Sequence, residues 1–240
     1  MAGLPLIAGT VTGLLLLTQP SEVIRAIGVA TLACVPATIL HLLVFSAMAR
    51  RHGPAACSAA ANITFALAAA ALGLLVTDVS LALPAAVAAV VAGGVWLGRQ
   101  SSEKPTAVPG PRSQGSRADD LPWRVGAAVL LAALLLVASE RAPAAVGGWL
   151  LALPIVGNVL PVFTLRRDGV AATQALLRGF VSGFGAFVGF FALLVIGLPL
   201  VETAIPAFAG PSALLVFGAA VLGAPIIGAA LAWVVRRIAG

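Results

Sequence analysis

Residues 171–199 read AATQALLRGFVSGFGAFVGFFALLVIGLP and carry a single charged side chain, that of Arg178. About 20 helical residues span the ~30 Å hydrocarbon core of a bilayer, so this stretch is long enough to cross a membrane. The whole chain has the same character, with 61% of its 240 residues hydrophobic and 9% charged. An ordinary soluble domain has roughly 25% charged residues. Because a soluble fold could not bury this much apolar surface, the composition predicts an all-α integral membrane protein in a lipid bilayer.

Eight apolar blocks of this kind follow one another along the chain. They cover residues 2–19, 25–49, 55–77, 80–98, 122–139, 143–165, 171–199 and 211–235. Residues 100–121 differ, since their Ser, Pro, Gly and charged side chains are typical of a flexible polar linker. The sequence therefore predicts eight transmembrane helices: a first four-helix unit over 1–99, a cytoplasmic linker over 100–121 and a second four-helix unit over 122–240.

The positions of the basic residues support eight helices with both termini cytoplasmic. In that topology twelve of the fourteen Lys and Arg residues face the cytoplasm, and only Arg25 and Arg141 lie outside. This distribution matches the positive-inside bias of membrane proteins. The basic residues form short clusters between apolar blocks, so a nucleic-acid partner is not expected.

The two halves of the chain contain a proline, an arginine pair and a glycine in the same order, which indicates a tandem duplication. Pro36 recurs as Pro154 at an offset of 118, and Arg50-Arg51 with Gly53 recurs as Arg166-Arg167 with Gly169 at an offset of 116. A unit of four helices inserts twice in the same direction. We therefore expect two parallel repeats about an axis along the membrane normal, with any central site between them.

Part of the second unit resembles a known family. A glycine precedes a proline in one helix, a charged turn ends in glycine, and the next helix opens with alanine; these are Gly148, Pro154, Arg167, Asp168, Gly169 and Ala172. The pattern resembles the small GlpM-type bacterial inner-membrane proteins, and Gly28, Pro36, Arg51 and Gly53 repeat it in the first unit. The resemblance implies a double copy of a four-helix protein in a bacterial inner membrane, with a role in envelope polysaccharide production.

Groups that could carry out chemistry are few. His41 and His52 are the only histidines and form no H-E-x-x-H motif, and Cys34 and Cys57 form no C-x-x-C motif. The sequence therefore predicts no catalytic group, no metal site and no cofactor, and the protein is not expected to be an enzyme.

Polar residues inside the apolar blocks are the candidate binding residues, because an unpartnered polar group in lipid is costly. Arg178 is predicted to face a cytoplasmic cavity, with Gln174 one turn earlier and Asn62 at the repeat-related position. Asn158 and His41 follow the equivalent prolines and form a second candidate pair. The alternatives are that Arg178 extends to the membrane interface and that the other side chains only hydrogen-bond neighbouring helices.

Prolines and glycines suggest where helices bend and touch. Pro36 and Pro154 are predicted to kink their helices or to act as hinges. Gly179 and Gly183, and Gly185 and Gly189, form two G-x-x-x-G pairs, which favour close helix packing. A sliding interface or a homodimer face are the alternative roles of these glycines.

Two functions are compatible with these features. The first is a transporter or flippase-like carrier of a small or amphipathic molecule, such as an anionic lipid-linked intermediate of envelope biosynthesis. The second is a non-catalytic scaffold subunit of an envelope polysaccharide or lipid assembly complex. The first hypothesis depends on the repeat and on Arg178, and the second on the lack of a deep carboxylate or catalytic cluster.

Overall fold

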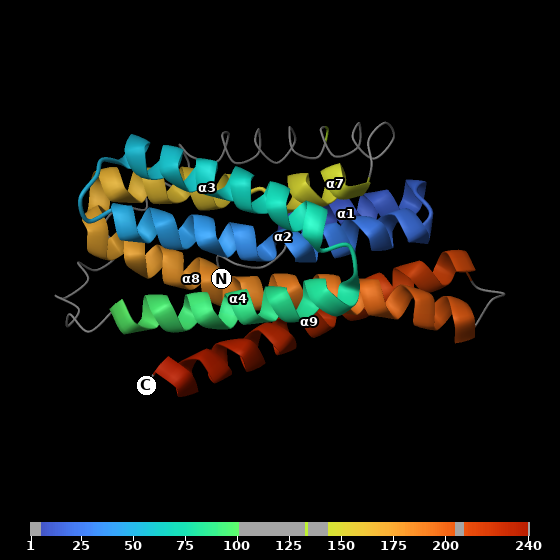
Figure 1. Cartoon of the computed structure of the whole chain (residues 1–240). Coiled ribbons are helices and arrows are strands. Elements are labelled where there is room, and N and C mark those ends of the chain that lie inside the picture. The colour runs from blue at the N-terminus through green and yellow to red at the C-terminus, as the bar shows by residue number, and fades with distance from the viewer. Residues whose placement is uncertain (1–5, 101–132, 134–143, 205–208, 240) are drawn as a thin grey trace.

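All elements of the described part of the chain are α-helices. The computed structural model describes residues 6–100, 133, 144–204 and 209–239. The helices are α1 (Leu6–Thr18), α2 (Ser21–Met48), α3 (Pro54–Leu75), α4 (Val79–Arg99), α7 (Ala144–Ala152), α8 (Ile155–Ala204) and α9 (Ala209–Ala239). Figure 1 shows them lying side by side as an elongated bundle.

Five helical stretches are long and apolar enough to cross a membrane, and Gly9–Thr18 is a shorter apolar helix. These helices suggest a multi-pass membrane protein. One of the five stretches, Val146–Ala204, contains the predicted block 171–199 and most of the predicted block 143–165. The predicted block 122–139, apart from residue 133, and the predicted linker beyond Gln100 lie outside the described residues. The total of eight spans and the parallel repeat therefore stay predictions.

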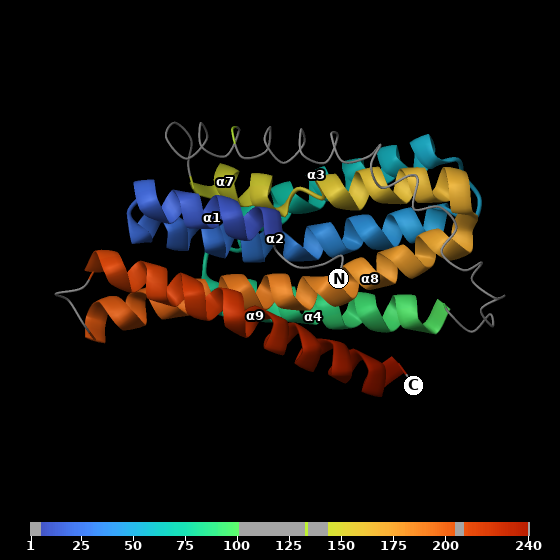
Figure 2. The same cartoon turned by 180° about the vertical axis from the view of Figure 1, so that it is seen from behind.

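Gly169 divides α8 into two helices. Its backbone has φ 79° and ψ −172°, a conformation that is essentially restricted to glycine. Thr173 Oγ1 donates a hydrogen bond of 2.8 Å to the Gly169 carbonyl and so supports the first turn after the break. Figures 1 and 2 show the chain reversing direction there. The turn at the related Gly53 differs, because Gly53 has φ −70° and Pro54 starts the next helix.

The two repeat-related prolines have different effects. Pro36 lies inside the continuous helix α2, whereas α7 ends at Ala152 and α8 begins only after Pro154. Thr38 on α2 donates a hydrogen bond of 2.9 Å to the carbonyl of Ala152, the last residue of α7. A side chain of α2 therefore supplies a hydrogen-bond donor to a carbonyl at the break next to Pro154. Interrupted helices in an apolar bundle need such side-chain donors, because no water is present to replace the lost backbone partner.

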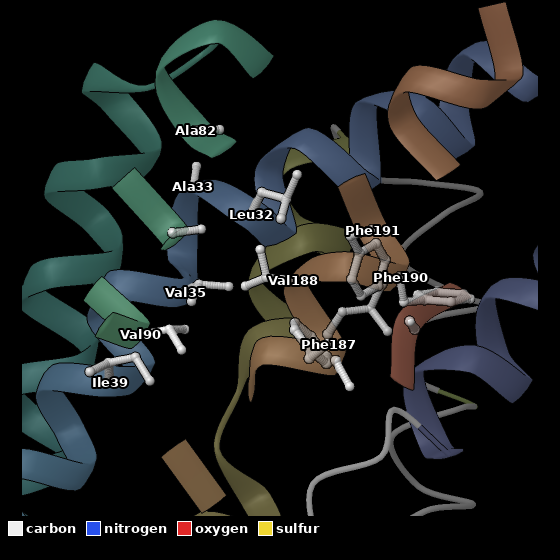
Figure 3. Packing of buried hydrophobic residues seen from close by; sticks show 14 of the residues in the cluster. Leu32, Ala33, Val35, Ile39, Ala82, Val90, Phe187, Val188, Phe190 and Phe191 are labelled. Carbon is white, nitrogen blue, oxygen red and sulfur yellow. The ribbon is translucent and has the colours of Figure 1, made fainter. Parts of the chain in front are cut away.

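Helix α2 lies at the centre of the bundle and packs against α3, α4, α7 and α8. Its side chains are buried on most sides. Figure 3 shows residues of α2, α4 and α8 meeting in the core: Leu32, Ala33, Val35, Ile39, Ala82, Val90, Phe187, Val188, Phe190 and Phe191. Phenylalanine rings continue the core toward α9, where Phe190 meets Phe217 edge to face at 5.8 Å.

Helices α8 and α9 approach closely through glycines. A methyl group on Gly185 would lie 3.2 Å from the Cα of Gly228, and one on Gly189 would lie 2.8 Å from Ile227. Such small residues let two backbones approach in an apolar medium. Gly183 is half-buried. Gly179 is exposed and has no atom within 4 Å of such a methyl group, so it takes no part in packing among the described residues.

The two ends of the bundle carry opposite charges. Figure 1 shows the C-terminus, the end of α4, the α2–α3 turn and the Gly169 reversal together at one end. The basic residues at this end are Arg50, Arg51, Arg99, Arg166, Arg167, Arg236 and Arg237, with Asp168 among them. Figure 1 shows the start of α2 and the end of α8 toward the opposite end; Glu22 and Arg25 lie in the first turns of α2, and Glu202 lies near the end of α8.

The reversal at Gly169 leads to a first prediction. Gly169→Ala should lower the free energy of unfolding by about 1–2 kcal/mol, because alanine strains a backbone at positive φ. No atom would lie within 4 Å of the added methyl group, so crowding does not contribute. The measurement is thermal or denaturant unfolding in detergent.

Gly53→Ala is the matched control, because its methyl group also meets nothing within 4 Å and its φ is −70°. Gly53 is the N-cap of α3, so alanine there loses some capping stability, but this variant should be destabilised clearly less than Gly169→Ala. Equal stability of the Gly169 and Gly53 variants would contradict the backbone argument.

Candidate functional site: a cationic cavity and a polar junction

A cavity of about 220 Å³ lies between α4, α8 and α9. Most of its wall is apolar and comes from Val90, Leu97, Val181, Leu231 and Val235. Gly94 lets α9 come close to α4, since a methyl group there would lie 2.8 Å from Val235. The polar lining consists of Ser182 and two arginines, Arg178 and Arg236.

Arg178 lines this cavity from α8. It is half-buried and follows the Gly169 break by nine residues, or ~13 Å of helix. Arg236 comes from the last turn of α9. The described lining contains no acidic side chain. Two guanidinium groups at one apolar cavity make it attractive to an anion, because charge-assisted hydrogen bonds are stronger where water is scarce.

Gln174 lies apart from this lining. It is buried one turn before Arg178, and its Nε2 donates to Oε1 of Gln100 over 3.5 Å. The contact joins the end of α4 to α8. Gln100 was missed by sequence reasoning because it lies at the predicted start of the linker.

Asn62 and Asn158 meet in a second polar cluster, which we call the polar junction. Together with Ser58 they form a closed ring of hydrogen bonds between α3 and α8. Ser58 Oγ donates to Asn158 Oδ1 over 2.7 Å, Asn158 Nδ2 to Asn62 Oδ1 over 3.0 Å, and Asn62 Nδ2 to Ser58 Oγ over 3.4 Å. Ser58 was not predicted, although its position one turn before Asn62 places both on one helix face.

His41 is fully buried on α2 beside the polar junction. The backbone of Ala61 on α3 and that of Gly157 on α8 lie near its imidazole. These two residues directly precede Asn62 and Asn158. Neither ring nitrogen finds a partner of full hydrogen-bond geometry in the described part of the protein.

The predicted binding residues are thus divided among three positions. His41, Asn62 and Asn158 gather where α2, α3 and α8 meet, Gln174 bonds to Gln100, and Arg178 lines the cavity. Asn62 was expected beside Arg178 but is hydrogen-bonded to Asn158 and does not line the cavity. Among the described residues, no group of three His, Cys, Asp or Glu side chains could hold a metal ion.

Long apolar helices suggest a multi-pass membrane protein. Comparison with protein-family models, with curated proteins and with solved structures found no match. The resemblance to the GlpM-type proteins therefore stays a prediction.

The polar junction leads to a second prediction. Asn158→Ala removes two hydrogen bonds between α3 and α8. It should lower the free energy of unfolding by about 1 kcal/mol, since such bonds contribute roughly 0.6 kcal/mol each between membrane helices. The measurement is unfolding in detergent.

Thr64→Val is the control, because Thr64 Oγ1 bonds only to the Ala60 carbonyl within its own helix. If Asn158→Ala lowers the free energy of unfolding no more than Thr64→Val does, the ring of hydrogen bonds does not hold α3 and α8 together.

Proposed function

We propose that the protein is a membrane carrier of an amphipathic anion, held between α4, α8 and α9. The observation that carries this proposal is the cavity with Arg178 and Arg236 on otherwise apolar walls. An anionic group of the ligand pairs with the guanidinium groups. Its hydrocarbon part contacts the valine and leucine side chains.

The size of the cavity favours a ligand that is only partly enclosed. A volume of about 220 Å³ accommodates a compact head group but lies below the usual range for a site that encloses a drug-sized molecule. The remainder of a lipid-like ligand extends out of the cavity along the helices. A lipid phosphate, or a lipid-linked intermediate of envelope synthesis, has this combination of a charged head and an apolar chain.

The proposed carrier also has a defined number of membrane spans and a defined orientation. We infer eight spans in two parallel four-helix repeats, with the basic end of the bundle in the cytoplasm of a bacterial inner membrane. The charge difference between the two ends supports this orientation. Movement of the ligand requires helices that shift against each other, and the close contact of Gly185 with Gly228 beside the cavity suits such a shift.

Substitution of Arg178 tests the proposal. Arg178→Ala should weaken binding of an anionic phospholipid roughly tenfold or more, because one charge-assisted hydrogen-bonding group is lost. Native mass spectrometry of the purified protein with added phosphatidylglycerol measures the bound fraction. Transfer of a labelled lipid in reconstituted vesicles should fall in parallel.

Arg237→Ala is the matched control, because Arg237 stacks 4.9 Å from the Trp233 ring centroid and does not line the cavity. Binding and transfer should stay at the parental level. Equal effects of the two substitutions would overturn the assignment of the cavity. A stoichiometric protein partner, recovered in mild detergent from a protein that binds and transfers no lipid, would favour the scaffold function.

A further inference from the structure

A second hollow lies along α4 and shares no residue with the cationic cavity. It is an open groove of about 530 Å³, which we call the α4 groove. Its described lining comes from α4, apart from Ile238 in the last turn of α9. Leu97 lines the cavity and Val95 lines the groove, and residues two positions apart point to different sides of a helix. The α4 groove is therefore a separate feature of the surface.

Small and apolar side chains form most of the length of the α4 groove. Ala88 and Ala92 are four residues apart, so they are neighbours along one side of α4. Both are exposed. Val91 and Val95 repeat the same spacing beside them. The result is a continuous apolar strip along the outside of the helix.

The strip ends at a positive charge. Arg99 lies in the last turn of α4, at the basic end of the bundle that Figure 1 shows, and it is the one charged residue of the described groove lining. Trp96 lies three residues earlier and is 38% exposed. Tryptophan rings and the cationic ends of long side chains are typical of the level at which lipid head groups meet the hydrocarbon.

The length of the strip matches one leaflet of a bilayer. Helix α4 is long and apolar enough to cross a membrane. From Ala88 to Arg99 the helix rises by ~17 Å, and half of the ~30 Å hydrocarbon core is ~15 Å. An acyl chain in the groove therefore extends from the head-group level at Arg99 to about the middle of the bilayer.

We propose that the α4 groove binds an anionic phospholipid of the leaflet at the basic end of the bundle. The lipid phosphate pairs with Arg99, and one acyl chain lies along the alanine and valine side chains. A positive side chain near the membrane surface attracts lipids of net negative charge, whereas a zwitterionic lipid brings a positive group of its own. This site does not depend on the cavity of the proposed function.

A second copy of the chain fits the groove less well than a lipid does. An interface of two α4 helices is self-complementary, with the same residues on both sides. Helix α4 has no acidic residue, so such a partner brings a second Arg99 and no negative group to pair with it. The charge of the groove thus favours the lipid.

The fluorescence of Trp96 tests occupancy of the groove. The chain has four tryptophans, so Trp123→Phe, Trp149→Phe and Trp233→Phe together leave Trp96 as the single indole. This variant is reconstituted in phosphatidylcholine vesicles that contain brominated phosphatidylglycerol or brominated phosphatidylcholine, because bromine quenches an indole that it contacts. We expect phosphatidylglycerol to bind beside Trp96 roughly fivefold more strongly than phosphatidylcholine.

Arg99→Gln in the same background should reduce this preference to about one. Arg51→Gln is the matched control, because it removes one positive charge from the same end of the bundle but does not line the groove. This control should keep the parental preference. An unchanged preference in Arg99→Gln would overturn the proposal. So would a lack of quenching by either lipid in a protein that stays helical, since protein would then cover the groove.

Native mass spectrometry with added phosphatidylglycerol provides a second measurement and leaves every tryptophan in place. Arg99→Gln should lose one tightly bound lipid that Arg178→Ala keeps, and the double variant should lose one more than either single variant. A parental lipid count in Arg99→Gln would overturn the groove site and leave the cavity unaffected. A parental count in Arg178→Ala, together with a loss in Arg99→Gln, would overturn the cavity and support the groove.

Discussion

Every backbone N–H and carbonyl in an apolar bundle must find its partner within the protein, and the other features of this fold follow from that requirement. Continuous helices satisfy it along most of the described chain. Prolines inside helices remove a backbone donor at Pro36, Pro84, Pro161, Pro199 and Pro225, and the helices break at Pro154 and Gly169. Thr38 and Thr173 donate to carbonyls next to the two breaks. Two threonine side chains thus bond to carbonyls where the helical backbone is broken.

The cationic cavity has a different origin. Its polar lining comes from the side chains of Ser182, Arg178 and Arg236 and not from an interrupted helix backbone. Hydrogen bonds within the protein account for the polar junction, whereas the cavity combines positive charge with apolar walls and open space. This contrast is why the cavity, and not the polar junction, supports a ligand-binding proposal.

Helix positions could be predicted because they depend on local properties. The described parts of the predicted blocks are helical apart from block ends and the break at Leu153–Pro154, and their boundaries fall near residues such as Pro54 and Asp78. The partners of single side chains could not be predicted in the same way. Asn62 and Arg178 occupy equivalent positions in the proposed repeat, yet Asn62 bonds to Asn158 while Arg178 faces α9. A repeat in sequence does not make the two environments alike, because the neighbouring helices differ.

The sequence by itself determined the all-helical, apolar character of the described chain, because hydropathy acts within a few residues. Only the tertiary structure decided which polar groups meet. It brought His41, 116 residues away in the chain, against Gly157, and it put Gly185 but not Gly179 in contact with α9. The physical reason is the rotation of each helix about its axis, which depends on packing with neighbours that are distant in sequence.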